Sequence, residues 1–216
     1  MLLIDSLTQS YNPVPAGISA WSRIGLGTGR LVGMALLVPT GFGVETALDA
    51  ACSLALADGV AVSVPAHGPL SALPALAATA LRRSGLAPDQ LEIAVTATQL
   101  DDAGVEGVLA LSALRDLGIA TALAAFCNRS AAQLPRLPVM RVVLAPEVLD
   151  EVPGVRAANS MLHALVTIAR RQGLQVTATQ IETETQRAIL SGFGCDQGEG
   201  TLFGPPQPVP MLHAVH

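Results

Sequence analysis

Aromatic side chains are scarce in this chain, at 3% of 216 residues, and charged side chains make up only 13%. Few aromatic rings leave few surfaces on which nucleobases could stack. The 12 Lys and Arg residues are outnumbered by 17 Asp and Glu, and a net charge of -5 provides no basic surface for a phosphate backbone. The composition therefore argues against a nucleic-acid-binding protein.

Cysteines and uninterrupted apolar runs are also scarce. Cys52, Cys127 and Cys195 are odd in number and widely spaced, which indicates reduced thiols and a cytoplasmic location. The N-terminal stretch contains Asp5 and lacks a basic region, so it does not resemble a signal peptide. Prolines interrupt the longest uncharged run, residues 60–81, which argues against a membrane span.

Apolar residues, by contrast, make up 50% of the chain. They can build a large core, but few charged groups remain to solvate the surface, so we expect part of that surface to contact a partner. The length suits a single domain. We expect an irregular N-terminal segment at 1–20, one domain at 21–207 and a C-terminal tail at 208–216.

Short β-rich runs alternate with longer helical runs along the chain. Strands that are apolar on both faces and alternate with helices predict an α/β fold with a parallel sheet, either closed into a barrel or open and doubly wound. The expected strands are 31–38, 59–64, 91–96, 119–123, 139–144 and 174–178, and the expected helices are 44–57, 69–84, 101–116, 155–171 and 182–191. In the fourth helix, the expected apolar stripe is Ala158, Met161, Leu162, Leu165 and Ile168.

The most informative stretch is 173–206, GLQVTATQIETETQRAILSGFGCDQGEGTLFGPP. It resembles the closing motifs of the bacterial EAL domain, a family of cyclic di-GMP phosphodiesterases. Upstream, TGRLVG at 28–33, LEIAVTAT at 91–98 and LGIATALAAF at 117–126 are similar to further strands of the same family. The resemblance implies an EAL-type modified TIM (β/α) barrel. The C-terminal residues in register are Ala178, Ile181, Glu182, Thr183, Gln186, Gly194, Cys195, Asp196, Gly200, Leu202, Phe203 and Pro206.

The resemblance also implies that the catalytic site has lost its ligands. In the family these positions hold Mg²⁺ or Mn²⁺, activate water or contact the ligand, and two-metal hydrolysis requires several carboxylates. The EAL tripeptide itself falls on 34–36, MAL, and a Met thioether cannot replace a carboxylate for a hard cation. The matching positions are Met34, Val38, Ser63, Ala94, Ala97, Ala124, Ala125, Val143, Ala145 and Thr179, together with two remaining acids, Glu182 and Glu199.

Two longer departures from the family pattern affect the barrel and its assembly. The chain between Met34 and Ser63 is short, which predicts a barrel trimmed in its first half. The loop that couples the family's active site to dimerisation reads AAFCNRSAAQL here, and replacing its glycines removes freedom to adopt positive φ. The family dimer is therefore in question, and the partner is expected to be another protein or a second copy of this chain.

Together these features predict a catalytically inactive EAL-like domain, not an enzyme, that acts through protein-protein interaction in bacterial signalling. We expect no metal cofactor, and an unneutralised Glu199 would repel the phosphates of cyclic di-GMP. The alternatives are a receptor that binds cyclic di-GMP without hydrolysing it and an active cyclic di-GMP phosphodiesterase.

Several weaker signals have simpler structural interpretations. Glycines at 25, 27 and 29 are typical of a hairpin turn rather than a phosphate-binding loop, because no helix start follows them. Asp101 and Asp102 are expected to open a helix rather than bind a metal. Cys127 beside Arg129 is expected to be a buried, inert thiol rather than a reactive one. The structural interpretation is also preferred for His67, His163, His213 and His216.

Overall fold

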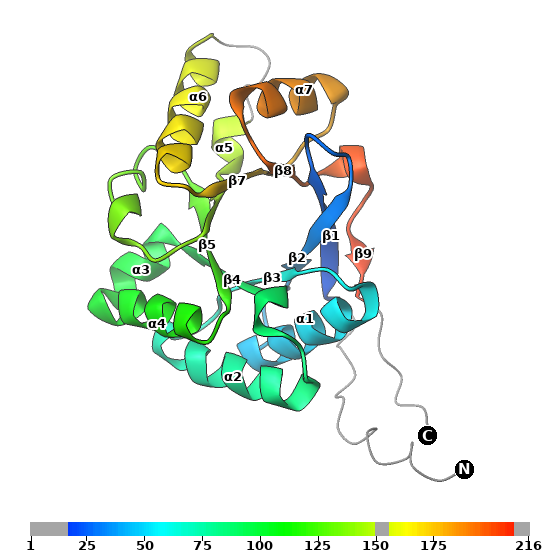
Figure 1. Cartoon of the computed structure of the whole chain (residues 1–216), viewed down its shortest axis with the longest axis vertical. Helices are drawn as coiled ribbons and strands as arrows, with labels where there is room; N and C mark the ends of the chain where they lie inside the picture. The colour runs from blue at the N-terminus through cyan, green and yellow to red at the C-terminus, as the bar shows by residue number, and fades with distance from the viewer. Residues whose placement is uncertain (1–16, 150–155, 210–216) are drawn as a thin grey trace.

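The computed structural model describes residues 17–149 and 156–209, and in this part of the chain eight strands close into a barrel with helices around the outside (Figure 1). β1 and β2 form an antiparallel hairpin, and β2 to β8 follow one another in parallel. β8 then pairs antiparallel with β1 and completes the ring, and β9 adds a short strand to the free edge of β1. The expected α/β barrel is confirmed, and the short first half does not prevent closure.

Most expected elements lie within a few residues of the observed ones. The strands are β1 (Ser19–Gly25), β2 (Leu31–Leu37), β3 (Val62–Pro65), β4 (Leu91–Thr96), β5 (Ala120–Phe126), β6 (Arg141–Leu144), β7 (Gln175–Ala178), β8 (Gln197–Gly198) and β9 (Gln207–Pro208). The helices are α1 (Val44–Asp58), α2 (Leu73–Ser84), α3 (Ala97–Ala103), α4 (Val105–Asp116), α5 (Pro146–Leu149), α6 (Arg156–Arg171) and α7 (Glu184–Phe193). Short 3₁₀ turns are η1 (Leu70–Ala72), η2 (Pro88–Gln90), η3 (Leu134–Arg136) and η4 (Thr201–Phe203).

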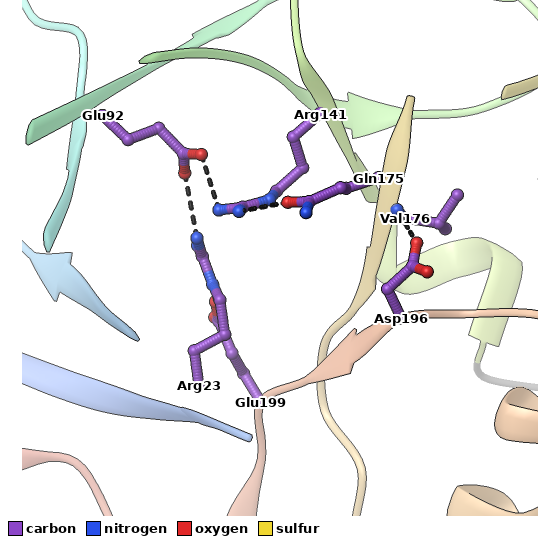
Figure 2. A network of polar contacts seen from close by, with 7 residues as sticks. All are labelled: Arg23, Glu92, Arg141, Gln175, Val176, Asp196 and Glu199. Carbon is purple, nitrogen blue, oxygen red and sulfur yellow. Dashed lines mark hydrogen bonds and ion pairs between the residues drawn. The ribbon is translucent and has the colours of Figure 1, made fainter. Parts of the chain in front are cut away.

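The strands separate an apolar outer layer from a polar barrel interior. In β4, Leu91, Ile93 and Val95 are fully buried in the apolar core, and each contributes about 2 kcal/mol through the hydrophobic effect. The alternating residue Glu92 points the other way, across the barrel interior (Figure 2). This alternation is what places polar side chains of distant strands near one another.

The prediction of a single helix at 101–116 is wrong, because the helix begins earlier and is interrupted. Thr96 and Gln99 form a capping box at the start of α3, and Gly104, with a φ of +56°, separates α3 from α4. Asp101 and Asp102 therefore lie in the last part of α3 rather than at a helix start. The Asp101 carboxylate accepts a hydrogen bond of 2.8 Å from Gln133 Nε2.

The buried face of α6 also differs from the expected stripe. Leu162 and Leu165 are buried as expected, whereas Met161 and Ile168 are 39% and 37% exposed. Val166 joins the buried face with Ala169. The side chain of Ala158 lies outside the described residues. The apolar residues alone could not separate the two faces, because α6 carries apolar side chains on both.

The glycines at 25–29 do form the expected hairpin turn between β1 and β2. Gly29 takes a φ of +67°, and its backbone N–H donates to the Gly25 carbonyl over 2.8 Å. One further feature bears on the expected location: in the described ranges, none of the helices is both long and apolar enough to cross a membrane.

Candidate functional site

A cavity of about 490 Å³ lies where several barrel strands reach their carboxyl ends. In barrels of this kind, active and binding sites are built from the loops at that end. The walls combine apolar side chains with two carboxylates. The lining residues are Trp21, Leu37, Ala125, Val143, Leu144, Pro146, Thr179, Gln180, Glu182, Glu199, Gly200 and Thr201.

Five of the twelve positions singled out in the sequence line this cavity. Ala125 and Gln180 are the two non-glycine residues with positive φ in the described chain, at +51° and +56°, so the backbone at the cavity rim is strained on both sides. The five lining positions are Ala125, Val143, Thr179, Glu182 and Glu199.

The remaining positions lie elsewhere in the barrel. Ser63 is buried, Ala94 and Ala124 are half-buried on β4 and β5, and Ala97 is the first residue of α3. Ala145 is buried directly after β6, where its N–H donates to the Phe126 carbonyl over 3.0 Å. Val38, after β2, packs against the apolar core.

Met34 requires a correction, because the structure places it on the opposite face of β2 from the cavity. Successive residues of a strand point to opposite faces. Leu37 lines the cavity, and Ala35 is on the same face and pairs directly with Trp21, which also lines it. Met34 instead packs against the apolar core. The inner position of this strand is therefore held by Ala35, since a shift of one residue exchanges the two faces.

A network of buried ion pairs lies inside the barrel next to the cavity (Figure 2). Arg23 Nε donates to Glu199 Oε1 at 2.7 Å, and Arg23 Nη1 donates to Glu92 Oε1 at 2.9 Å. Arg141 Nη1 reaches Glu92 Oε2 at 2.6 Å, and Arg141 Nη2 reaches Gln175 Oε1 at 2.6 Å. The network ties together β1, β4, β6, β7 and the residue after β8.

The electrostatics of the network keep Arg23, Glu92 and Arg141 ionised. Burial alone would raise the pKa of Glu92, but the guanidinium groups of Arg23 and Arg141 lower it by more, so that the pKa of Glu92 lies below its usual value. Burial alone would lower the pKa of Arg23, yet Glu199 and Glu92 raise it overall. Burial lowers the pKa of Arg141 despite the attraction of Glu92, but an arginine starts high enough to stay charged. Glu199 is therefore neutralised by Arg23, which corrects the expectation of an unneutralised carboxylate.

The sequence interpretation missed Arg23, Arg141 and Glu92 because none of them belongs to a recognised ligand motif. The available signal was local: SRIG in β1 and LEIAV in β4 each place one charged residue among apolar neighbours. Such a residue is rarely fully buried unless it is paired. That pattern predicts a buried partner without saying which one.

Several residues of the C-terminal motif have structural roles. Asp196 accepts a hydrogen bond from the backbone N–H of Val176 at 2.8 Å (Figure 2), and from Arg170 at 3.1 Å. Thr183 and Gln186 form a capping box that starts α7. These contacts explain how the motif can preserve the fold independently of any chemistry in the cavity.

Polar groups without hydrogen-bond partners lie below the cavity. The Thr179 hydroxyl, which lines the cavity, is buried and has no hydrogen-bond partner in the described part of the chain, and the same holds for the Thr177 hydroxyl and Gln197 Oε1. Thr177 is fully buried and Gln197 is 9% exposed. Thr177 pairs across the sheet with Val143, a cavity residue, and with Gln197. Thr177 and Gln197 are therefore neighbours on the barrel interior beneath the cavity, where Arg141 Nε is also unpaired among the described residues.

Contrary to expectation, Cys127 is not buried. The side chain is only half-buried, and although burial acts to raise the pKa of the thiol, hydrogen bonds from Arg129 and Ser130 lower it overall. Cys195 is buried, and burial raises its pKa to about 12. Burial likewise raises the pKa of Cys52. No described base is positioned as a catalytic partner for Cys127.

The donor set of the cavity does not fit a Mg²⁺ or Mn²⁺ centre. Such ions bind several hard oxygen ligands. Within residues 17–149 and 156–209, no group of three or more His, Cys, Asp and Glu side chains could hold a metal ion. The cavity has two carboxylates, and one of them, Glu199, is already bonded to Arg23.

Comparison with known protein families identifies residues 59–206 as an EAL domain. The segment is 30% identical over 138 residues to MucR of Pseudomonas aeruginosa, a bifunctional diguanylate cyclase/cyclic di-GMP phosphodiesterase. It is also 30% identical over 135 residues to NbdA, a cyclic di-GMP phosphodiesterase of the same organism. Each match covers 62% of this chain but only 20% of MucR and 17% of NbdA.

Solved structures share the fold. The PaMucR phosphodiesterase in complex with c-di-GMP superimposes with a TM-score of 0.79 at 21% identity, covering 89% of this chain and 92% of that one. The EAL domain of Mycobacterium smegmatis DcpA gives a TM-score of 0.79 at 19% identity, covering 89% and 93%. Identities of this size support the barrel itself.

The comparisons overturn one prediction from the sequence. The chain was expected not to be an enzyme, but NbdA and PaMucR, which it resembles in sequence and in fold respectively, are phosphodiesterases. The finding that overturns the prediction is the match of residues 59–206 to the EAL domain, the family to which these enzymes are similar. The chain belongs to the EAL domain family, which is related to cyclic di-GMP phosphodiesterases.

Proposed function

We propose that this EAL domain is a regulatory protein of bacterial cyclic di-GMP signalling that acts by binding another protein at the carboxyl-end cavity. The observation that carries the proposal is the lining of the cavity. Its walls combine apolar, neutral polar and carboxylate side chains, and none of the Arg or His side chains that the structure describes lines it. A nucleotide phosphate requires cationic groups or a metal for recognition, whereas an apolar cavity with a few polar groups suits a protein side chain.

The proposal is supported by the position of the cavity on the surface. Leu37, at the rim, is 41% exposed, which gives a partner an apolar contact next to the opening. Trp21 supplies the aromatic wall that protein interfaces favour. The cavity can therefore accept one protruding side chain while its rim contacts the surrounding surface.

The test is a binding comparison with a matched pair of variants. Candidate regulators of flagellar, secretion or transcription systems are titrated into the purified chain by isothermal calorimetry. Val143→Arg fills the cavity wall with a long cationic side chain and should abolish binding, whereas Asp89→Asn, in η2 at the amino end of the barrel, should not affect it. If neither binding nor a co-purifying partner is found, or if Val143→Arg binds normally, the proposal fails.

The activity of the relatives is measured on the same samples. Cyclic di-GMP is incubated with the chain and Mn²⁺, and linear product is quantified. Turnover that disappears in Glu199→Gln would assign the function of the family to this chain and would contradict the proposal of a protein-binding role for the cavity.

A second candidate is a receptor that binds cyclic di-GMP without hydrolysing it. The observation that favours it is the cavity itself: at about 490 Å³ it has the size of a small-molecule site, and Trp21 offers a face on which a base could stack. Thermal denaturation with millimolar cyclic di-GMP tests it. A rise in melting temperature in the wild type that is lost in Trp21→Leu would support the receptor, and no rise eliminates it.

A further inference from the structure

The geometry points to a basic side chain, lysine or arginine, as the group that the carboxyl-end cavity binds. This inference rests on the proposed function, because it names the chemistry that the partner protein presents at the same site. It follows from the charges that line the cavity, from unpaired acceptors beneath it and from its apolar wall.

The charges that line the cavity favour a cation. Glu182 is exposed at the rim, and Glu199, which is 6% exposed, lines the interior. The ion pair with Arg23 uses Glu199 Oε1, so that Oε2 carries no hydrogen bond from a described residue. Among the described residues no basic side chain lines the cavity, so the charged groups that an entering group contacts directly are the carboxylates of Glu182 and Glu199, the second of which shares its charge with Arg23.

A second and independent feature is the unpaired Thr179 hydroxyl in the cavity lining, with further unpaired oxygens on Thr177 and Gln197 beneath it. The Thr179 hydroxyl, the Thr177 hydroxyl and Gln197 Oε1 are buried without partners among the described residues. Buried polar groups are normally hydrogen-bonded, and an unpaired one carries an uncompensated cost of desolvation. An ammonium or guanidinium group supplies several N–H donors and no acceptor, so it complements oxygen acceptors and a carboxylate together.

The wall above these acceptors suits the aliphatic part of such a side chain. Trp21 presents an aromatic surface, and Leu37, Leu144 and Pro146 complete the apolar lining. Lysine and arginine bury their methylene groups against apolar surface while the charged head reaches polar groups, and a cation near an indole gains a cation–π contribution. The net charge of -5 on the chain also favours encounter with a basic partner.

The test uses blocked amino acids, because a charged probe and a neutral probe of nearly the same shape show whether the charge of the side chain is needed for binding. Nα-acetyl-arginine methylamide and Nα-acetyl-lysine methylamide are titrated into the ¹⁵N-labelled full chain, with Nα-acetyl-citrulline methylamide as the neutral analogue of arginine. We expect at least one basic probe to shift the amide resonances of cavity residues. Citrulline should bind about tenfold more weakly or not at all, because it loses the charge-assisted hydrogen bonds.

Variants locate the site. Glu182→Gln should weaken the basic probe about threefold and Glu199→Gln about tenfold, whereas the control Asp89→Asn should leave it unchanged. Since Glu199 also pairs with Arg23, Thr179→Val provides a further variant that leaves every ion pair in place. Equal binding of citrulline, resonance shifts confined to another region, or wild-type affinity in both Glu182→Gln and Thr179→Val would overturn the inference.

A free polyamine presents the same chemistry from a different source. Spermidine that binds at least tenfold more tightly than either blocked amino acid would overturn the assignment to a protein side chain. Failure of the proposed function is distinguishable, because a chain without a protein partner can still bind the arginine probe. Conversely, suppose that a partner protein binds with an affinity that Glu182→Gln does not change while no basic probe binds. That result would contradict the inference of a basic side chain but not the proposed protein-binding function.

Discussion

The two ends of the barrel interior differ in charge, and the difference separates stability from function. Toward the amino end, Glu92 and Arg141, on the second residue of β4 and the first of β6, form a buried network with Arg23. At the carboxyl end, where a family enzyme would place its ligands, Ala125, Val143 and Thr179 line the cavity. The strongest electrostatic interactions of this interior therefore hold strands together, and only Glu199 belongs to both regions.

The largest expected effect comes from breaking the charged region at its centre. Glu92→Ala removes the carboxylate that pairs with both Arg23 and Arg141 and leaves their guanidinium groups buried. Removing one partner of a buried ion network lowers the free energy of unfolding by about 3–5 kcal/mol. Urea denaturation followed by circular dichroism measures the loss in free energy of unfolding. The exposed control Asp89→Asn should change it by less than about 0.5 kcal/mol. A loss below about 1 kcal/mol in Glu92→Ala would contradict the structural role of the network.

The next effect tests the backbone that supports the cavity. Gly200 has a φ of +150°, and a Cβ atom added there would collide with the backbone N and O of Ile181. Gly200→Ala should lower the free energy of unfolding by about 3 kcal/mol, because strain and backbone displacement each cost about 1–3 kcal/mol. Gly204→Ala is the matched control, since Gly204 has a φ of +105° but open space around it. If both variants lose the same free energy of unfolding, the close approach of Gly200 to Ile181 does not explain why a glycine is needed at position 200.

Acid should weaken the charged region selectively. The pKa of Glu92 is lower in the folded chain than in the unfolded one, where a Glu titrates near about 4.3. The stability that this difference provides is present above the unfolded pKa and is lost as the pH falls through the folded pKa. Unfolding free energies of wild type and Glu92→Gln, measured from pH 7 to pH 3, should therefore converge as the pH falls. Exposed Glu182→Gln should follow the wild type in parallel, and a constant gap for Glu92→Gln would refute the prediction.

A smaller effect, of opposite sign, is expected in the cavity. The Thr179 hydroxyl is buried without a partner among the described residues, so Thr179→Val removes a desolvation cost and should stabilise the fold by up to about 1 kcal/mol. Thr96→Val is the contrast, because Thr96 caps α3 and its loss costs about 1 kcal/mol. Differential scanning calorimetry measures the change in melting temperature of both variants. A rise for Thr179→Val with a fall for Thr96→Val would show that Thr96, and not Thr179, contributes to folding stability. Equal destabilisation by the two changes would place Thr179 among the structural residues.

The smallest change concerns the rate of a reaction rather than stability. Hydrogen bonds lower the pKa of Cys127, whereas burial raises those of Cys52 and Cys195. Iodoacetamide at pH 8 should alkylate Cys127 at least about tenfold faster than the other two, as followed by peptide mass spectrometry. Faster labelling of Cys195 would indicate that the carboxyl-end motif opens in solution.

The barrel could be predicted from the sequence because its elements depend on local signals. Alternating apolar runs located the strands, and GCD, IETETQ and the final Pro206 placed the last turns of the chain in register with a known family. The break at Gly104 and the early start of α3 were missed. The sequence offers two possible helix starts, the capping box at Thr96 and the acidic pair five residues later. In the structure the helix begins at the capping box.

The candidate site was predictable only in part. Five matched positions do line the cavity, because they follow directly after strands whose carboxyl ends converge. Met34 does not line the cavity. β2 carries apolar residues on both faces, so the motif match alone could not decide which face points into the barrel. The pairing with β1 decides it, because Trp21 lies opposite Ala35.

The sequence by itself determined the family, the order of most strands and helices, and which side chains are present at the matched positions, because these depend on neighbours along the chain. Only the tertiary structure decided that Arg23 joins Glu92 and Glu199, which are 69 and 176 positions away. It also decided that the shortened first half closes a ring, and that the Thr179 hydroxyl, unpaired among the described residues, lines a cavity. Contacts across a barrel depend on strand register and closure, and those are fixed only when all eight strands have found their neighbours.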